Sequence, residues 1–186
     1  MRKAIVFAVL SVLVVGPAVA GELTFHVGVG YHMSFYDSPP DFQLSEGSNP
    51  KETAELLQVL PLGVGAYAGL GYGFGFKALL SLGLELAPSW SFSVFPAFVS
   101  NLGYQARVFL KVKPIDAITA TVFTGWAGDQ FSGGDIEGWQ DTDIGNGAIG
   151  ARLTIFPVYI EYAAIVPWDF STLMKNEVGI GFALYR

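Results

Sequence analysis

The residues best placed for chemistry are His32 and Ser34, which one residue separates in the segment His32-Met33-Ser34. In an extended strand, side chains two positions apart point to the same side. An imidazole beside a hydroxyl is the minimum needed to activate a serine nucleophile. An esterase is therefore one hypothesis for this chain. The alternative is a pair of polar groups without catalytic role, because only loop acids such as Asp37 follow them.

A second candidate for chemistry is a group of acids that lie close together in the sequence. They are Asp135, Glu137, Asp141 and Asp143. Oxygen ligands of this kind suit Ca²⁺ or Mg²⁺, but the spacing does not match an EF-hand loop. Solvated acidic loops are ordinary on protein surfaces, so we predict no metal and no cofactor. The chain has 0 cysteines, which excludes disulfides and thiolate metal sites.

The elements that must position these residues are strands with alternating side chains. Between Gly21 and Asp37 the apolar residues are Leu23, Phe25, Val27, Val29, Tyr31 and Met33. The residues between them are small or polar, and include Thr24, His26 and His32. A strand with this pattern has one apolar face and one small or polar face. Similar alternation recurs from residue 60 onward, in segments of about ten residues.

The composition indicates where such strands belong. The chain is 52% hydrophobic and 14% charged, yet no apolar run after residue 20 reaches the ~20 residues of a spanning helix. Strands that are apolar at alternate positions, with 23 glycines in the chain, are typical of a transmembrane β-barrel. The alternative is a soluble β-sandwich with one buried face.

The N-terminal segment is typical of a secretory signal peptide. Arg2 and Lys3 precede an apolar run, Gly16-Pro17 interrupts it, and Ala18-Val19-Ala20 supplies small residues for cleavage. We therefore expect residues 1–20 to be removed and residues 21–186 to form one domain; the alternative is a membrane-spanning anchor. Without Arg2 and Lys3, 8 basic residues remain against 16 acidic ones, a net charge of −8 that argues against nucleic acid as a partner.

The strand count follows from the connections. The three longest predicted loops are 34–56, 128–142 and 167–176, the first with a short helix within 51–60. Long loops of outer-membrane barrels lie on one side, so an even number of strands must fit between Leu57 and Ala127. The predicted breaks there give five segments, which is not allowed. These breaks are Gly69–Gly73, Pro88-Ser89, Asn101–Gly103 and Lys113–Asp116.

One false break would give eight strands in total, and one missed break would give ten. We favour eight, because Asn101–Gly103 or Gly69–Gly73 can be a bulge or kink rather than a turn. The predicted fold class is thus an all-β, transmembrane, antiparallel up-and-down barrel of eight strands, with ten as the alternative.

Eight ionisable residues fall on the inner faces of these strands. They are His26, His32, Lys77, Glu85, Arg107, Lys111, Arg152 and Glu161. The interior of an eight-stranded barrel is just wide enough to be filled by side chains, so opposite charges should pair there into a plug. The alternative is a narrow pore in which Arg107, Lys111 and Arg152 tune passage.

The C-terminal segment VGIGFALYR, residues 178–186, places Ile180, Phe182 and Leu184 at alternate positions, with Tyr185 near the end. In this feature and in its whole pattern the chain resembles the small outer-membrane proteins of the OmpA, OmpX and OmpW type. The resemblance implies that the barrel-assembly machinery reads the last strand, although the family usually finishes on an aromatic residue and Arg186 follows here.

The His-x-Ser pair is also similar to that of outer-membrane lipid A deacylases. In that family the pair lies late in the chain with a downstream acid, whereas here it lies on the first strand. We therefore predict no catalytic residues and no enzyme.

The predicted function is that of an integral barrel of the bacterial outer membrane with a structural or surface-interaction role. The alternative is a narrow porin-like channel for small or hydrophobic solutes. Expected partners are outer-membrane lipid, the assembly machinery and an extracellular ligand at loops 34–56 and 128–142. These loops carry Phe42, Phe131 and Trp139.

Overall fold

All elements in the described part of the chain are β-strands. The computed structural model describes residues 21–36, 59–60, 62–74, 79–93, 99–133, 140–167 and 175–185. The predicted signal peptide, residues 1–20, and the predicted lumen residue Lys77 lie outside these ranges. No helix among the described residues is long and apolar enough to cross a membrane. The strands are β1 (Gly21–Tyr36), β2 (Val59–Leu60), β3 (Leu62–Phe74), β4 (Leu80–Ser93), β5 (Val99–Ile115), β6 (Ile118–Gly133), β7 (Gln140–Ile155), β8 (Val158–Pro167) and β9 (Lys175–Tyr185).

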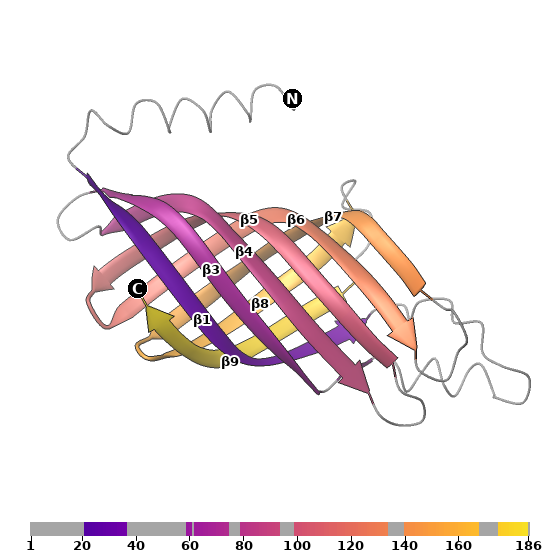
Figure 1. Cartoon of the computed structure of the whole chain (residues 1–186). Helices are drawn as coiled ribbons and strands as arrows, with labels where there is room; N and C mark the ends of the chain where they lie inside the picture. The colour runs from indigo at the N-terminus through magenta and orange to yellow at the C-terminus, as the bar shows by residue number, and fades with distance from the viewer. Residues whose placement is uncertain are drawn as a thin grey trace, which may run out of the picture.

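The strands form one closed antiparallel sheet (Figure 1). From β3 to β9 each strand pairs with the next one along the chain, and β1 pairs with both β3 and β9, which closes the wall. β2 and β3 both pair with β1 and are separated by one residue, so they share one position in the wall. The prediction of an all-β barrel with eight strands is confirmed, and the alternative of ten is wrong.

Side chains on the wall alternate between outside and inside, as the sequence pattern predicts. On β1, Leu23 and Phe25 are 68% and 52% exposed, whereas Thr24 and His26 are 9% and 6% exposed. Exposed apolar side chains on the other strands include Val64, Leu84, Leu110, Val122, Ile149, Ile160 and Ile180. An apolar surface that encircles a closed wall is stable only in contact with hydrocarbon, because its exposure to water would cost free energy. The protein is a transmembrane barrel.

The two ends of the barrel differ. At one end, called the turn end here, β1, β4, β6 and β8 begin, β3, β5, β7 and β9 end, and the turns 116–117 and 156–157 lie. At the opposite end, called the loop end, β1, β4, β6 and β8 end and β3, β5, β7 and β9 begin. In Figure 1 the turn end lies at the left. Each of the three longest predicted loops spans the interval between a strand that ends at the loop end and one that begins there, and residues 37–56, 134–139 and 168–174 of these loops lie outside the described residues.

The predicted turn at Gly69–Gly73 is wrong, because β3 is paired through this segment with both β1 and β4. The glycines make room for side chains inside the barrel and do not form a turn. A Cβ on Gly69 would lie 2.3 Å from His26 Cε1, and one on Gly71 would lie 2.8 Å from Phe109 Cζ. Gly69 therefore makes room for the ring of its cross-strand partner His26, and Gly71 makes room for the ring of Phe109 on β5.

The predicted turn at Pro88-Ser89 is also wrong, because β4 continues to Ser93. Proline has no N–H to donate, so it weakens a ladder without necessarily ending the strand. The β3–β4 pairing is accordingly interrupted at Ala87 and Pro88, between the pairs Ala68↔Leu86 and Gly65↔Ser89.

Two further boundaries differ from the prediction. Asn101–Gly103 is no break, because β5 begins at Val99 and these residues pair with both β4 and β6. The predicted loop over 128–142 is mostly strand, because β6 and β7 continue their hairpin to Ser132↔Gln140. Of the helix expected within 51–60, residues 51–58 lie outside the described residues, and Val59–Leu60 form β2.

Candidate functional site

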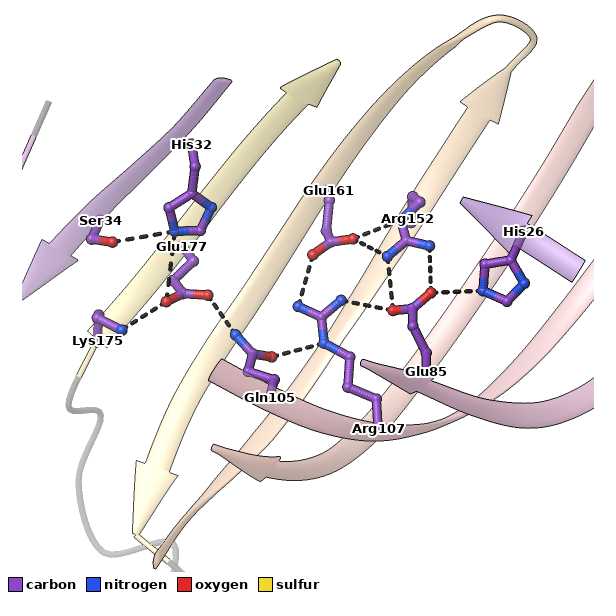
Figure 2. A network of polar contacts seen from close by, with 10 residues as sticks. All are labelled: His26, His32, Ser34, Glu85, Gln105, Arg107, Arg152, Glu161, Lys175 and Glu177. Atoms are coloured by element: carbon purple, nitrogen blue, oxygen red, sulfur yellow. Dashed lines mark hydrogen bonds and ion pairs between the residues drawn. The ribbon is translucent and has the colours of Figure 1, made fainter. Parts of the chain in front are cut away.

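The centre of the lumen is organised around Glu85 of β4, which is 2% exposed. Arg152 of β7 donates from Nη1 to Glu85 Oε2 at 2.7 Å and from Nη2 to Oε1 at 2.9 Å. Arg107 of β5 donates from Nη1 to Oε1 at 2.9 Å, and His26 Nε2 of β1 lies 2.7 Å from Oε2. One carboxylate therefore connects four strands of the wall, β1, β4, β5 and β7, and its contacts are drawn in Figure 2.

A second carboxylate, Glu161 of β8, holds the same two guanidinium groups. Arg107 Nη2 donates to Glu161 Oε1 at 2.8 Å, and Arg152 Nε donates to Oε2 at 2.6 Å. Glu85, Arg107, Arg152, Glu161 and His26 are called the central cluster here. Removal of one partner from such a buried set leaves a charge without compensation.

Aromatic rings fill the space around the two arginines. Arg107 Cζ lies 3.9 Å from the Phe123 ring centroid, and Arg152 Cζ lies 3.3 Å from that of Tyr67. Tyr67 also meets Tyr159 edge to face at a centroid distance of 5.1 Å. The cavity beside Arg107 on its loop-end side has a volume of about 20 Å³, which is enough for about one water molecule. The lumen at this level is closed by side chains.

The polar contacts continue from the central cluster toward the loop end. Gln105 accepts from Arg107 Nε at 2.8 Å and donates from Nε2 to Glu177 Oε2 at 2.5 Å. Glu177 pairs with Lys175 Nζ at 2.7 Å, and Lys175 also contacts Asp129. A continuous series of polar contacts thus connects His26 with the loop end (Figure 2). Its part beyond the central cluster, which starts at Gln105 and includes Glu177, is called the ladder here.

The His32 and Ser34 side chains do come together. Ser34 Oγ lies 3.3 Å from His32 Nε2 and 3.2 Å from Ser91 Oγ. Glu177 Oε1 lies 3.7 Å from the same nitrogen of His32. In a catalytic triad the acid instead holds the ring nitrogen opposite the one that faces the serine. Because acid and hydroxyl meet one nitrogen, and Ser34 is 0% exposed, the arrangement lacks the orientation and access of an activated nucleophile.

Seven of the eight predicted lumen residues lie on the inner wall of the described barrel, and Lys77 lies outside the described residues. Five of the seven form the central cluster, and His32 belongs to the ladder beyond it. Lys111 is 7% exposed but joins neither group, and it forms no ion pair with a described residue. The expectation that opposite charges pair therefore does not extend to Lys111.

Sequence reasoning did not select Gln105, Lys175, Glu177 or Asp129. Lys175 and Glu177 share the inner face of β9 with Gly179, so the alternation on that strand could have identified them. Asp129 was hidden by its assignment to a loop, because the rule of alternation was not applied there. Of the acids considered for a metal, Asp135 and Glu137 lie outside the described residues, and the described part contains no cluster that could hold a metal ion.

No model of a known protein family matches the chain, and no curated protein sequence matches it. The chain is similar to the crystal structure of Ail, the attachment invasion locus protein of Yersinia pestis, with 14% identity, a TM-score of 0.44, and coverage of 89% of this chain and 100% of that one. It is also similar to Ail in complex with the heparin analogue sucrose octasulfate, with 12% identity, a TM-score of 0.47 and the same coverage. At such low identity each residue must be interpreted from its own contacts.

The comparison with small barrels ends at the fold. The eight-stranded architecture expected from the resemblance to OmpA- and OmpX-type proteins is the one that this chain forms. The chain is an eight-stranded transmembrane β-barrel whose lumen carries a ladder of paired charges.

Proposed function

We propose that the protein is a non-conducting barrel of the bacterial outer membrane that holds its loop-end connections in place for contact with partners outside the cell. The observation that carries this proposal is the central cluster, in which Arg107 and Arg152 join Glu85 to Glu161 across the lumen. A solute could pass only if these buried pairs opened. The cluster therefore favours a scaffold over the narrow porin-like channel.

The unlike ends of the barrel support the proposed orientation. Bacterial outer-membrane barrels have short periplasmic turns and longer extracellular loops. Here the two-residue connections 116–117 and 156–157 lie at the turn end, and the longest connection, 37–58, lies at the loop end. We assign the turn end to the periplasm and the loop end to the cell exterior.

The lipid and assembly partners follow from the outer surface. Ile180, Phe182 and Leu184 of β9 are 50%, 58% and 63% exposed, which suits contact with acyl chains. Because β9 closes the barrel against β1, it is also the segment that we expect the assembly machinery to bind. Delivery to that machinery requires export, for which residues 1–20 are the proposed signal peptide.

The proposed role requires no chemistry at His32 and Ser34. Their contacts with Ser91 and Glu177 support a structural function in the ladder. The remaining candidates for contact with a partner are the predicted loop segments 34–56 and 128–142, of which the structure describes residues 34–36, 128–133 and 140–142 as strand.

The orientation can be tested by cysteine labelling, because the natural chain has 0 cysteines. Gly138→Cys would place one thiol in the connection between β6 and β7, and Ala117→Cys would place one in the turn between β5 and β6. We expect a membrane-impermeant maleimide to label the first variant on intact cells. The second should react only after the outer membrane is disrupted.

Both variants replace one small residue of the same barrel by cysteine, so each serves as a control for the expression and thiol reactivity of the other. Labelling of Ala117→Cys but not of Gly138→Cys on intact cells would show that the barrel has the opposite orientation. Recovery of both variants in the soluble fraction would overturn the membrane location.

A further inference from the structure

The lumen has a polar chamber at the turn end, on the side of the central cluster opposite the ladder. Its volume is about 230 Å³. β4, β5, β6 and β7 contribute Ser81, Lys111, Thr121 and Arg152, which follow one another across paired strands. Because residues directly opposite in a ladder place their side chains on the same face, this row forms a continuous inner surface. This surface and the cavity that it borders are called the turn-end chamber here.

Positive charge dominates the lining of this chamber. Its cations are Lys111, Lys113 and Arg152, and its acid is Glu22 at the mouth, while His26 also lines it. Arg152 is held by Glu85 and Glu161, and Lys113 Nζ lies 3.5 Å from Asp116. Lys111 is the exception, because its side chain is buried, with 7% exposure, and it forms no ion pair with any described residue.

Hydroxyl groups share the chamber with this ammonium. Thr24, Ser81, Thr119, Thr121 and Thr154 all line the chamber. Thr24 Oγ1 and Ser81 Oγ are buried and have no hydrogen-bond partner among the described residues, and the same holds for His26 Nδ1. A buried polar group without a partner costs free energy, and so does a buried charge. The cost of the Lys111 charge would be offset by a ligand in the chamber that accepts hydrogen bonds and carries negative charge.

We propose that the turn-end chamber binds a phosphoryl group, with the Lys111 ammonium and the hydroxyls of Thr119 and Thr121 as donors. A phosphoryl group has several acceptor oxygens around one centre, which suits an ammonium and hydroxyls carried by the adjacent strands β5 and β6, where Thr121 is the direct cross-strand partner of Lys111. Lys113 at the rim adds positive charge, and Glu22 opposes it at the mouth. The cavity exceeds the size of a single water site by far, so a small solute or a lipid headgroup can enter.

The probe for a free ligand is inorganic phosphate. Calorimetric titration of the refolded chain, residues 21–186, in a phosphate-free sugar detergent should give saturable binding. Lys111→Met should weaken it at least about tenfold, since it removes a charge-assisted donor. Lys51→Met, in the connection between β1 and β2, makes the same chemical change elsewhere and should leave the affinity unchanged.

A second arm identifies a headgroup as the source of the phosphoryl group. Wild-type protein extracted gently from membranes would be analysed by mass spectrometry for bound phospholipid, beside Lys111→Met and Lys51→Met. Phosphate binding that depends on Lys111, or phospholipid lost only in Lys111→Met, supports the site. Equal binding by wild type and Lys111→Met in both arms, or binding in neither arm, overturns it. Heat-dependent electrophoretic mobility of each variant verifies that the barrel has formed.

Discussion

The central cluster and the turn-end chamber line the same lumen but treat charge in opposite ways. In the cluster, Glu85 and Glu161 accept hydrogen bonds from both Arg107 and Arg152. In the chamber, Lys111 is buried without an ion pair among the described residues, and Thr24 and Ser81 keep unused hydroxyls. Complete pairing closes the lumen and stabilises it, whereas incomplete pairing leaves donors available for a ligand.

The largest expected effect comes from the acid at the centre of the cluster. Glu85→Gln keeps the shape of the side chain but leaves Arg107, Arg152 and His26 without their shared charge. Loss of one partner of a buried ion pair costs about 3–5 kcal/mol, so we expect the free energy of unfolding to fall by this amount. Urea titration in lipid vesicles, followed by tryptophan fluorescence, measures it. A fall below about 1 kcal/mol, as found for exposed pairs, would show that the cluster does not stabilise the barrel.

The next largest effect compares the same two levels on the outer surface. Leu84 precedes the cluster residue Glu85, and Leu80 begins β4 at the turn end. Arginine on the lipid face costs about 2–4 kcal/mol at the bilayer midplane and about 0–1 kcal/mol near an interface. We therefore expect Leu84→Arg to destabilise the barrel more than Leu80→Arg in the same urea titration. Equal losses would place both residues at one depth.

A smaller effect of opposite sign is expected in the chamber. Lys111→Met removes a buried cation that has no ion pair in the described part of the chain, and methionine keeps most of the side-chain volume. Replacement of buried charge by an apolar group is often neutral or stabilising by about 1–4 kcal/mol, and we expect the low end in phosphate-free buffer. Chemical unfolding of the two proteins side by side tests the sign. Destabilisation comparable to that of Glu85→Gln would remove the contrast between the two regions.

The smallest effect is expected at the loop end. Ser34→Ala removes the contacts of this hydroxyl with Ser91 Oγ and His32 Nε2, at 3.2 and 3.3 Å. A neutral hydrogen bond contributes about 0.5–1.5 kcal/mol, and the long distances favour the lower part of this range. Thermal unfolding in detergent, with wild type as reference, measures the difference. A loss above about 3 kcal/mol would mean that the ladder depends on Ser34 as the cluster depends on Glu85.

The sequence was informative wherever the period of a strand decides the outcome. Alternation placed Glu85, Arg107 and Arg152 inside and Leu84 outside, because a one-residue shift would exchange the two faces. It could not supply the register that sets Glu85 opposite Arg107 and Arg152 opposite Glu161, because register arises between strands.

The errors of the prediction have a common physical origin. Glycine and proline were interpreted as turn signals, but Gly69 and Gly71 leave room for the His26 and Phe109 rings, and Pro88 is tolerated within a strand. Lys111 was expected to pair because cations and acids share the inner face. Its isolation follows from its position near the turn end, because the nearer acids Glu85 and Glu161 are held by the two arginines and the acids of the ladder lie beyond the central cluster.

The claim that the lumen is closed can be tested most directly by electrical recording. Residues 21–186 would be refolded and inserted into planar lipid bilayers, and the ionic current would be measured over a range of voltages. The central cluster predicts no stepwise conductance above that of the protein-free bilayer. Reproducible ohmic channels formed by the wild-type chain would contradict the closed lumen and, with it, the proposed role as a non-conducting scaffold.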